Sequence, residues 1–276
     1  MKKLNICFVL AICLLGPGAT TKAPLPQAEI CGGRNVTTQN SEQIMYIVYY
    51  TVAGIYVNAG NATFTNSVER LNGKPVFHIT ANGATNTKYD WIFKVRDKYE
   101  SYIDTTTMQP LKFVRDVSEG NHKHYENITF NHAANTAVTK NGVYKVPDCV
   151  QDVISAVYSA RNIDFDKYKK DDKIPFKLFL DNEVYDMYIR YMGREDVKTK
   201  YGKFRAHKFR PLLIKGTIFE GGEKMTVWVS DDANRVPLRI ESPIVVGSVK
   251  IDMMSYRNLR YPLSSLKKFN GQNLSQ

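Results

Sequence analysis

The stretch that decides the fold is TVWVSDDANRVPLRI, residues 226–240. Apolar side chains alternate at Met225, Val227 and Val229, and a period of two is typical of a β-strand. The Asp- and Asn-rich centre supplies turn-forming hydrogen bonds and tolerates positive φ angles. Pro237 then opens a second strand, where its missing N–H does least harm. The stretch therefore predicts a β-hairpin.

The same pattern occurs earlier in the chain, in DTTTMQPLK, residues 104–112. Both stretches have an Asp, five intervening residues, a Pro-Leu pair and then a base. Upstream of each, a Gly-Lys pair is followed at the same distance by a histidine, His78 or His207. Because the spacing between the copies is nearly constant, the sequence predicts two repeats, at residues 42–131 and 174–256.

Other segments also have the composition of strands. Trp91, Phe93 and Val95 alternate in front of the first hairpin, and 17 Tyr and 13 Phe in the whole chain favour strands further. Residues 44–50 carry apolar side chains on both faces, which predicts a sheet with a core on one face and a cover on the other. The remaining predicted strands are residues 44–57, 62–71, 125–130, 174–180, 184–192, 204–214 and 245–253.

One helix is predicted between the repeats, at residues 148–161. Asp148 is the expected N-cap, and Gln151 completes a capping box. A stripe at helical spacing comprises Val150, Val153, Ile154, Val157, Tyr158 and Arg161. The opposite, polar face comprises Gln151, Asp152, Ser155 and Ser159. This amphipathic pattern predicts that the helix lies on a sheet with its apolar stripe inward.

Together these elements predict a mainly β fold: an antiparallel, open or half-closed β-barrel built from two repeats, with one prominent helix between them. A chain of 276 residues is long enough for a single large domain. We expect a signal peptide at residues 1–22, a flexible N-terminal segment at 23–41, one β domain at 42–265 and a tail at 266–276.

The N-terminus has the order of a secretory signal peptide. Lys2 and Lys3 precede an apolar run, residues 4–15, and small residues follow it, so cleavage is expected between residues 18 and 23. Lipid anchoring at Cys13 is the weaker alternative, because Ile12 is too bulky for the usual position before a lipidated Cys. No second apolar run is long enough to span a membrane. The sequence thus predicts a protein exported to the periplasm or cell envelope of a bacterium.

The net charge limits the classes of predicted binding partner, and the cysteine content limits the possible disulfides. The formal net charge is +11, of which signal removal would take two or three lysines, so we expect attraction to anionic headgroups or acidic glycans. No helix-turn-helix, zinc-finger or RNA-binding motif occurs, so nucleic acid is not a predicted partner. Cys31 and Cys149 remain after signal removal, either as a disulfide or as two thiols. The sequence does not indicate an oligomeric state.

No catalytic motif is found. The chain lacks Gly-x-Ser-x-Gly, His-Glu-x-x-His, a Walker loop and a dinucleotide fingerprint, so no catalytic residue and no cofactor is predicted. His122 and His124 are two apart on a strand and could face one metal ion together. A polar strand end beside the Gly120-Asn121 turn is the simpler interpretation. We therefore predict no metal and keep these two histidines as weak candidates.

Three stretches carry a family resemblance: residues 90–104, 150–162 and 226–237. On these the chain resembles an exported bacterial family, domain of unknown function 3108, over nearly all of residues 40–265. The resemblance implies no activity and no site. More remotely, the hairpin at 228–239 is similar to one of the LolA/LolB periplasmic lipoprotein carriers. That similarity implies an open barrel with helices across its mouth and an apolar pocket.

The predicted function is a non-enzymatic binding or carrier module for an amphiphilic, lipid-like ligand or another envelope component. Basic residues after the two Pro-Leu pairs would hold an anionic head, and aromatic residues beside the turns would line the walls, although core packing is their alternative role. The candidate ligand-binding residues are Trp91, Tyr99, Tyr102, Lys112, Trp228 and Arg239. Two other functions stay open: a secreted hydrolase acting on envelope glycan or lipid, and a structural protein of the envelope.

Overall fold

A single antiparallel sheet forms nearly the whole fold in the computed structural model, which describes residues 30, 33–52, 55–214, 221–244 and 247–270. The first meander, as we call strands β1 to β6, comprises Gln43–Val52, Ile55–Leu71, Lys74–Thr85, Val95–Asp104, Pro110–Glu119 and His122–Asn131. A short hairpin follows, with β7 at Thr136–Thr139 and β8 at Gly142–Lys145. The second meander, strands β9 to β14, comprises Lys173–Leu180, Glu183–Lys198, Gly202–Pro211, Thr226–Ser230, Pro237–Pro243 and Ser248–Arg257. β15, at Leu266–Phe269, pairs with β11.

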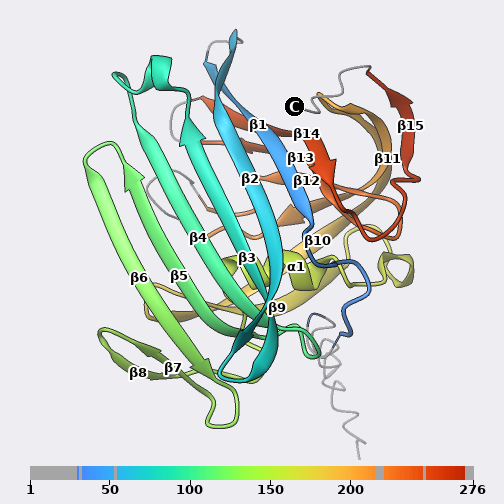
Figure 1. The fold of residues 1–276 in the computed structure, drawn as a ribbon. Coiled ribbons are helices and arrows are strands. Elements are labelled where there is room, and N and C mark those ends of the chain that lie inside the picture. The colour runs from blue at the N-terminus through green and yellow to red at the C-terminus, as the bar shows by residue number, and fades with distance from the viewer. Residues whose placement is uncertain (1–29, 31–32, 53–54, 215–220, 245–246, 271–276) are drawn as a thin grey trace, which may run out of the picture.

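The two meanders join where β1 pairs with β14, and the sheet runs without a break from β8 through this seam to β9. The sheet curls around the central helix without closing (Figure 1). The prediction of a mainly β, antiparallel, open fold is thus confirmed. Each meander has six strands in chain order, which is the order a duplication would produce. The repeat itself stays a prediction.

The helix α1, Val153–Ala160, is shorter than predicted and begins later. Its N-cap is Asp152, which forms a capping box with Ser155, and Asp148 lies outside the helix. Residues before the cap serve the sheet instead: the Gln151 N–H donates to Lys177, and the Phe179 N–H donates to the Gln151 carbonyl, both at 2.9 Å. Backbone pairing with β9 therefore replaces the predicted first turn.

The predicted orientation of the helix is only partly right: Ile154 and Tyr158 of the apolar stripe are buried as predicted, but the polar face is buried beside them. Its polar residues are buried: Ser101 donates to Asp152 at 2.6 Å, and Ser159 donates to the Met108 carbonyl at 3.1 Å. These bonds fasten the polar face to the first meander. Val157, on the predicted inward stripe, is 40% exposed. Hydrogen bonds to the sheet thus turn part of the apolar stripe away from it.

Three buried clusters form the core. The first joins the inner face of the first meander to α1 and includes Phe179 of β9. The second lies around the β1–β14 seam and includes Phe204 and Trp228. The third lies in the second meander around Phe165, in the 3₁₀ turn at Phe165–Lys167, and Phe209. The clusters bind the two meanders and the helix into one body.

Several predicted boundaries need correction. Predicted strand 44–57 spans the β1–β2 connection, and Trp91 and Phe93 lie in the β3–β4 loop, which begins with a 3₁₀ turn at Thr87–Tyr89. The predicted tail at 266–276 begins with strand β15. In the predicted flexible segment, Thr37 and Thr38 are buried. The signal peptide, Cys13 and Cys31 lie outside the described residues and stay predictions, and no described helix is long and apolar enough to cross a membrane.

The cap of α1 predicts an unusual pH dependence of stability. Burial raises the pKa of Asp152 to about 6, although hydrogen bonds from Ser101 and Ser155 favour the ionised form. Between about pH 4 and pH 6 the folded state then holds a proton that the unfolded state has lost, so stability falls as the pH rises through this range. Asp152→Asn keeps the cap and cannot titrate, and should remove roughly 3 kcal/mol of this fall.

Urea denaturation at several pH values from 4 to 7 measures the effect. Asp97, whose pKa burial also raises to about 6, is present in both proteins, so its contribution cancels in the comparison. Asp152→Ala is the matched variant, because it removes the titration and the cap together and should cost about 1 kcal/mol more than Asp152→Asn at pH 7. Equal slopes in the wild type and Asp152→Asn would contradict the prediction.

Candidate functional site

The main candidate site is an apolar cavity of about 400 Å³ between α1 and the second meander. A second cavity, of about 210 Å³, lies toward β1 and β2. The two share four lining residues: Val157, Arg161, Pro237 and Ile240. They form an apolar space that extends past both sides of the helix. Its size falls in the range of ligand-binding cavities.

The walls come from both sides of the space. On the strand side, Val227 and Val229 line the cavity, whereas Trp228, between them, is buried in the second core cluster. This is the alternation expected of a strand. On the helix side, the small residues Ala156 and Ala160 and the half-exposed Val157 line it. The helix therefore presents an apolar face to open space.

Among the lining residues of the two cavities that the structure describes, Arg161 carries the one charge, and that charge is already compensated. Arg161 donates to both carboxylate oxygens of Glu42, at 2.6 and 2.9 Å, and to the Asn234 carbonyl at 3.2 Å. Burial opposes the positive charge, but Glu42 overcomes it and keeps the pKa of Arg161 above its ordinary value. Burial also raises the pKa of Tyr46 and Tyr158, so both phenols stay neutral. The described walls of the cavity therefore carry no unpaired charge.

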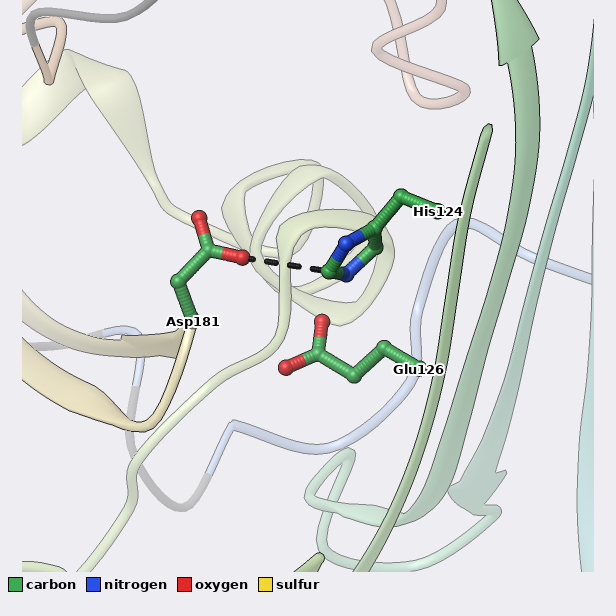
Figure 2. A group of neighbouring side chains, drawn as sticks. All are labelled: His124, Glu126 and Asp181. Atoms are coloured by element: carbon green, nitrogen blue, oxygen red, sulfur yellow. Dashed lines mark ion pairs between the residues drawn. The ribbon is translucent and has the colours of Figure 1, made fainter. Parts of the chain in front are cut away.

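A second, polar site lies where β6 meets the β9–β10 turn. Ligand atoms of His124, Glu126 and Asp181 lie within 4.8 Å of one another (Figure 2). The Arg115 guanidinium is among them, with Nη2 2.7 Å from His124 Nε2 and 3.1 Å from Glu126, and it also pairs with Asp181. Burial, and next Arg115, lower the pKa of His124. The Arg115 guanidinium supplies the positive charge that a metal ion would bring. We therefore interpret the group as an ion-pair cluster that links the first meander to the second.

The comparisons with known proteins follow this geometry. The model of one family, described as a protein of unknown function (DUF3108), matches residues 45–254. The chain belongs to the DUF3108 family. This confirms the resemblance seen in the sequence, and the family's description names no activity. No curated protein is significantly similar to the chain in sequence.

The DUF3108 chain is similar in fold to a β-barrel-like protein of domain of unknown function DUF1849 from Brucella abortus. The identity is 8% and the TM-score 0.52, over 82% of this chain and 99% of that one. Two other solved structures are described as "a putative lipoprotein" from Parabacteroides distasonis and "a putative exported protein with YmcC-like fold" from Bacteroides fragilis. They share 15% and 11% identity, with TM-scores of 0.36 and 0.33, over 82% of this chain and 99% and 100% of theirs. Both scores are too low to support an inference.

The six candidate ligand residues of the DUF3108 protein do not come together. Trp91 is 82% exposed in the β3–β4 loop. Tyr99 packs against the first core cluster, 6.4 Å from Phe113, and burial raises the pKa of Tyr99 to about 12. Tyr102 lies on the other face of β4, stacked on His78 at 4.2 Å, with the Lys112 ammonium 5.5 Å from its ring centroid. None of these lines the cavity.

The remaining two candidates lie together near the seam. The Trp228 indole donates to Glu195 at 2.7 Å, and its ring is covered by Lys208. Arg239 binds both carboxylate oxygens of Asp252, at 2.6 and 2.8 Å. Arg239 lines a separate polar hollow of about 370 Å³ beside Lys198 and Lys200. Both residues have internal partners, and their predicted role in binding stays a prediction.

The histidines of the DUF3108 protein have structural partners. His78 contacts Glu69 at 2.9 Å and Glu100 at 3.0 Å. His207 is buried, contacts Asp231 at 3.0 Å, and has a pKa lowered by that burial. Neither lines the cavity.

The two weak metal candidates are neighbours. His124 belongs to the polar cluster, and the His122 ring stacks on the His124 ring with centroids 6.4 Å apart.

Sequence reasoning missed most of the cavity. Its walls combine aliphatic side chains with Phe165, Phe176 and Phe209, none of which was a candidate. On the strand side the signal lay in the alternation of Val227 and Val229, which was used only to predict a strand. The helix residues were identified as an apolar stripe, but the stripe was predicted to pack on the sheet. No role in a cavity was therefore assigned to it. No local signal shows that Ser155 and Ser159 lie on the buried face, so the sequence did not indicate this second apolar surface.

Proposed function

We propose that the protein binds an amphiphilic molecule whose acyl-like chain lies in the cavity between α1 and the second meander. The observation that carries the proposal is Val157, an aliphatic side chain 40% exposed on a helix whose polar face is buried. A helix that only covered a sheet would bury its valines and expose its serines. Here Ser155 and Ser159 are buried beside Ile154 and Tyr158, which leaves the Val157 side of the helix as apolar surface for a ligand to cover.

The size and chemistry of the space support this ligand class. Burying a methylene is worth about 0.8 kcal/mol, so about ten of them contribute roughly 8 kcal/mol of favourable free energy, from which the cost of association is subtracted. With Arg161 neutralised by Glu42, the walls suit the chain rather than a charged head. The head contacts predicted at Lys112 and Arg239 are not included, because neither lines the cavity.

The wall chemistry favours binding over hydrolysis. Among the described residues that line the two cavities there is no Ser, Cys, His, Asp or Glu, the groups that would serve as nucleophile or general base. A purely structural barrel would fill this space with side chains. We further propose that the ligand is met in the cell envelope, because Lys2, Lys3 and the apolar run 4–15 have the pattern of an export signal.

The test fills the cavity without disturbing the core. Val157→Trp adds an indole at a position that already faces open space, so the protein should stay folded while affinity for a fluorescent fatty acid falls by roughly tenfold or more. Binding is measured by fluorescence titration of delipidated protein. Native mass spectrometry of the wild type purified from its own envelope should show a co-purifying amphiphile, which the variant should lack.

Val143→Trp is the matched control. Val143 is 68% exposed on the β7–β8 hairpin and lines neither cavity, so the same substitution there should leave affinity unchanged. Equal affinity in the wild type and Val157→Trp would place the fatty acid elsewhere and end the proposal. So would a wild type that neither retains an amphiphile nor binds the probe at micromolar concentration.

A further inference from the structure

A cluster of large apolar side chains is exposed at one end of the first meander. In the β3–β4 loop Trp91, Ile92 and Phe93 are 82%, 62% and 50% exposed. At the start of β2, Ile55 and Tyr56 are 65% and 60% exposed. We call these five residues the tip. Single exposed apolar residues are ordinary, but five large ones on adjoining segments mark an interaction surface.

Hydrogen bonds next to the tip join the start of the β3–β4 loop to β2. The Asn86 N–H donates to the Ala59 carbonyl at 2.8 Å, and the Asn86 side chain donates to the Asn58 carbonyl at 2.9 Å. The loop therefore adjoins the first residues of β2. In Figure 1 both lie at the upper end of the first meander, away from the β7–β8 hairpin at the lower left.

The loop has a built structure. Asp90 accepts from Thr85 at 2.9 Å and from Arg96 at 2.6 Å, and the Val95 N–H donates to Thr85 at 3.0 Å. Phe93 packs over Gly120, where a Cβ atom would come within 2.9 Å of its ring. These contacts hold the backbone so that Trp91 and Ile92 point away from the protein. Their exposure is a feature of a fixed loop.

Three lysines lie in or beside the tip, and Glu119, at the end of β5, is a carboxylate next to the loop. Lys88 and Lys94 are exposed within the loop, and the Lys250 ammonium lies 4.2 Å from the Tyr56 ring centroid. The loop's acidic residue, Asp90, is already paired with Arg96. Aromatic rings mixed with lysines suit the interface of an anionic bilayer: the rings settle at headgroup level, and the ammonium groups reach the lipid phosphates. A protein partner would need matching carboxylates instead.

We propose that the tip docks the protein on the surface of an anionic phospholipid bilayer. Trp91, Ile92 and Phe93 insert among the headgroups, and Lys88 and Lys94 lie against the phosphates. The inference does not depend on a ligand in the cavity, since none of the tip residues lines it. Membrane docking and ligand binding are therefore separable by experiment.

The main experiment is sedimentation of the purified protein with vesicles. Vesicles of phosphatidylethanolamine and phosphatidylglycerol should bind the wild type, and phosphatidylcholine vesicles should bind it much more weakly. The triple variant W91S/I92S/F93S and the double variant K88E/K94E should each lose roughly tenfold or more in partitioning to the anionic vesicles. All variants have the same N-terminus, so any contribution of the apolar run 4–15 to vesicle binding is the same in each.

V138S/V143S is the matched control. These two valines are 42% and 68% exposed on the β7–β8 hairpin, and their replacement should leave vesicle binding unchanged. Fatty-acid binding without vesicles should be unaffected in the tip variants, which separates a failure of docking from a failure of the cavity proposal. The inference would be overturned if the wild type did not bind anionic vesicles. It would also be overturned if a folded triple variant bound them as well as the wild type does.

Fluorescence gives a second readout that does not require replacing apolar residues of the tip by polar ones. The chain has two tryptophans, of which Trp228 is 8% exposed, so a blue shift and quenching by brominated acyl chains would report Trp91. W91F should abolish both signals while retaining most of the binding. Vesicle binding with no change in Trp91 emission would also overturn the docking geometry, even if the triple variant failed to fold.

Discussion

Arg161→Met is expected to lower the free energy of unfolding by about 3–5 kcal/mol, because it leaves the Glu42 carboxylate buried without its cation. The two side chains are 3% and 1% exposed, so water cannot replace the lost partner. The guanidinium also donates to the Asn234 carbonyl, in the turn between β12 and β13. Its loss should therefore loosen the contact between α1 and the second meander. Urea denaturation at pH 7 measures the change.

The pair behaves as a unit, and the control follows from that. Glu42→Leu alone should cost a similar amount, because it leaves the Arg161 charge buried and unpaired. The double variant E42L/R161M removes both charges, and its cost should be well below the sum of the two single effects. A double variant whose cost equals that sum would show that the residues contribute separately, contrary to the buried ion pair.

The class of the fold could be predicted from local pattern alone. Residues 226–240 form the predicted hairpin, with the second strand opening at Pro237. Alternation identified these strands because each has neighbours on both edges and a buried face. The same rule failed at Trp91 and Phe93, because an exposed loop can alternate by chance and no local signal distinguishes it from a strand.

The candidate site was harder to predict, because strands of a curled sheet carry apolar residues on both faces. Tyr102 and Lys112 pack on each other on the side of β4 and β5 away from α1, whereas Ser101 faces the helix. Which face encloses the cavity depends on how the sheet curls, and curling arises from contacts between distant segments. Arg239 likewise found its partner, Asp252, on the next strand.

The helix shows the same limit in another form. Gln151, Asp152, Ser155 and Ser159 were read as a solvent face because serine and aspartate are usually exposed. In the fold each is buried, and Ser101 and the Met108 carbonyl, both from the first meander, supply hydrogen-bond partners. Such partners are distant in sequence and cannot be seen in an amphipathic pattern.

Phe179→Ala is expected to cost about 3–5 kcal/mol, because the residue links the two edges of the open sheet. Phe179 belongs to β9 of the second meander, but it is fully buried in the first core cluster. Its ring lies 6.2 Å from Phe130 in an edge-to-face contact and 5.8 Å from Tyr144. No β9–β8 ladder closes the described sheet, so this packing, the backbone pairing at Gln151 and the Arg115 cluster hold the two edges together.

Phe93→Ala is the matched control, since that ring is 50% exposed and should cost less than about 1 kcal/mol. Hydrogen exchange adds a test of location. If Phe179 links the two edges of the sheet, its loss should speed amide exchange in β9 and in the β7–β8 hairpin more than at the β1–β14 seam, which is paired from Gln43 to Thr51 of β1. Uniform acceleration across both meanders would indicate a general core residue, because local opening requires that the seam keep its protection while the edges separate.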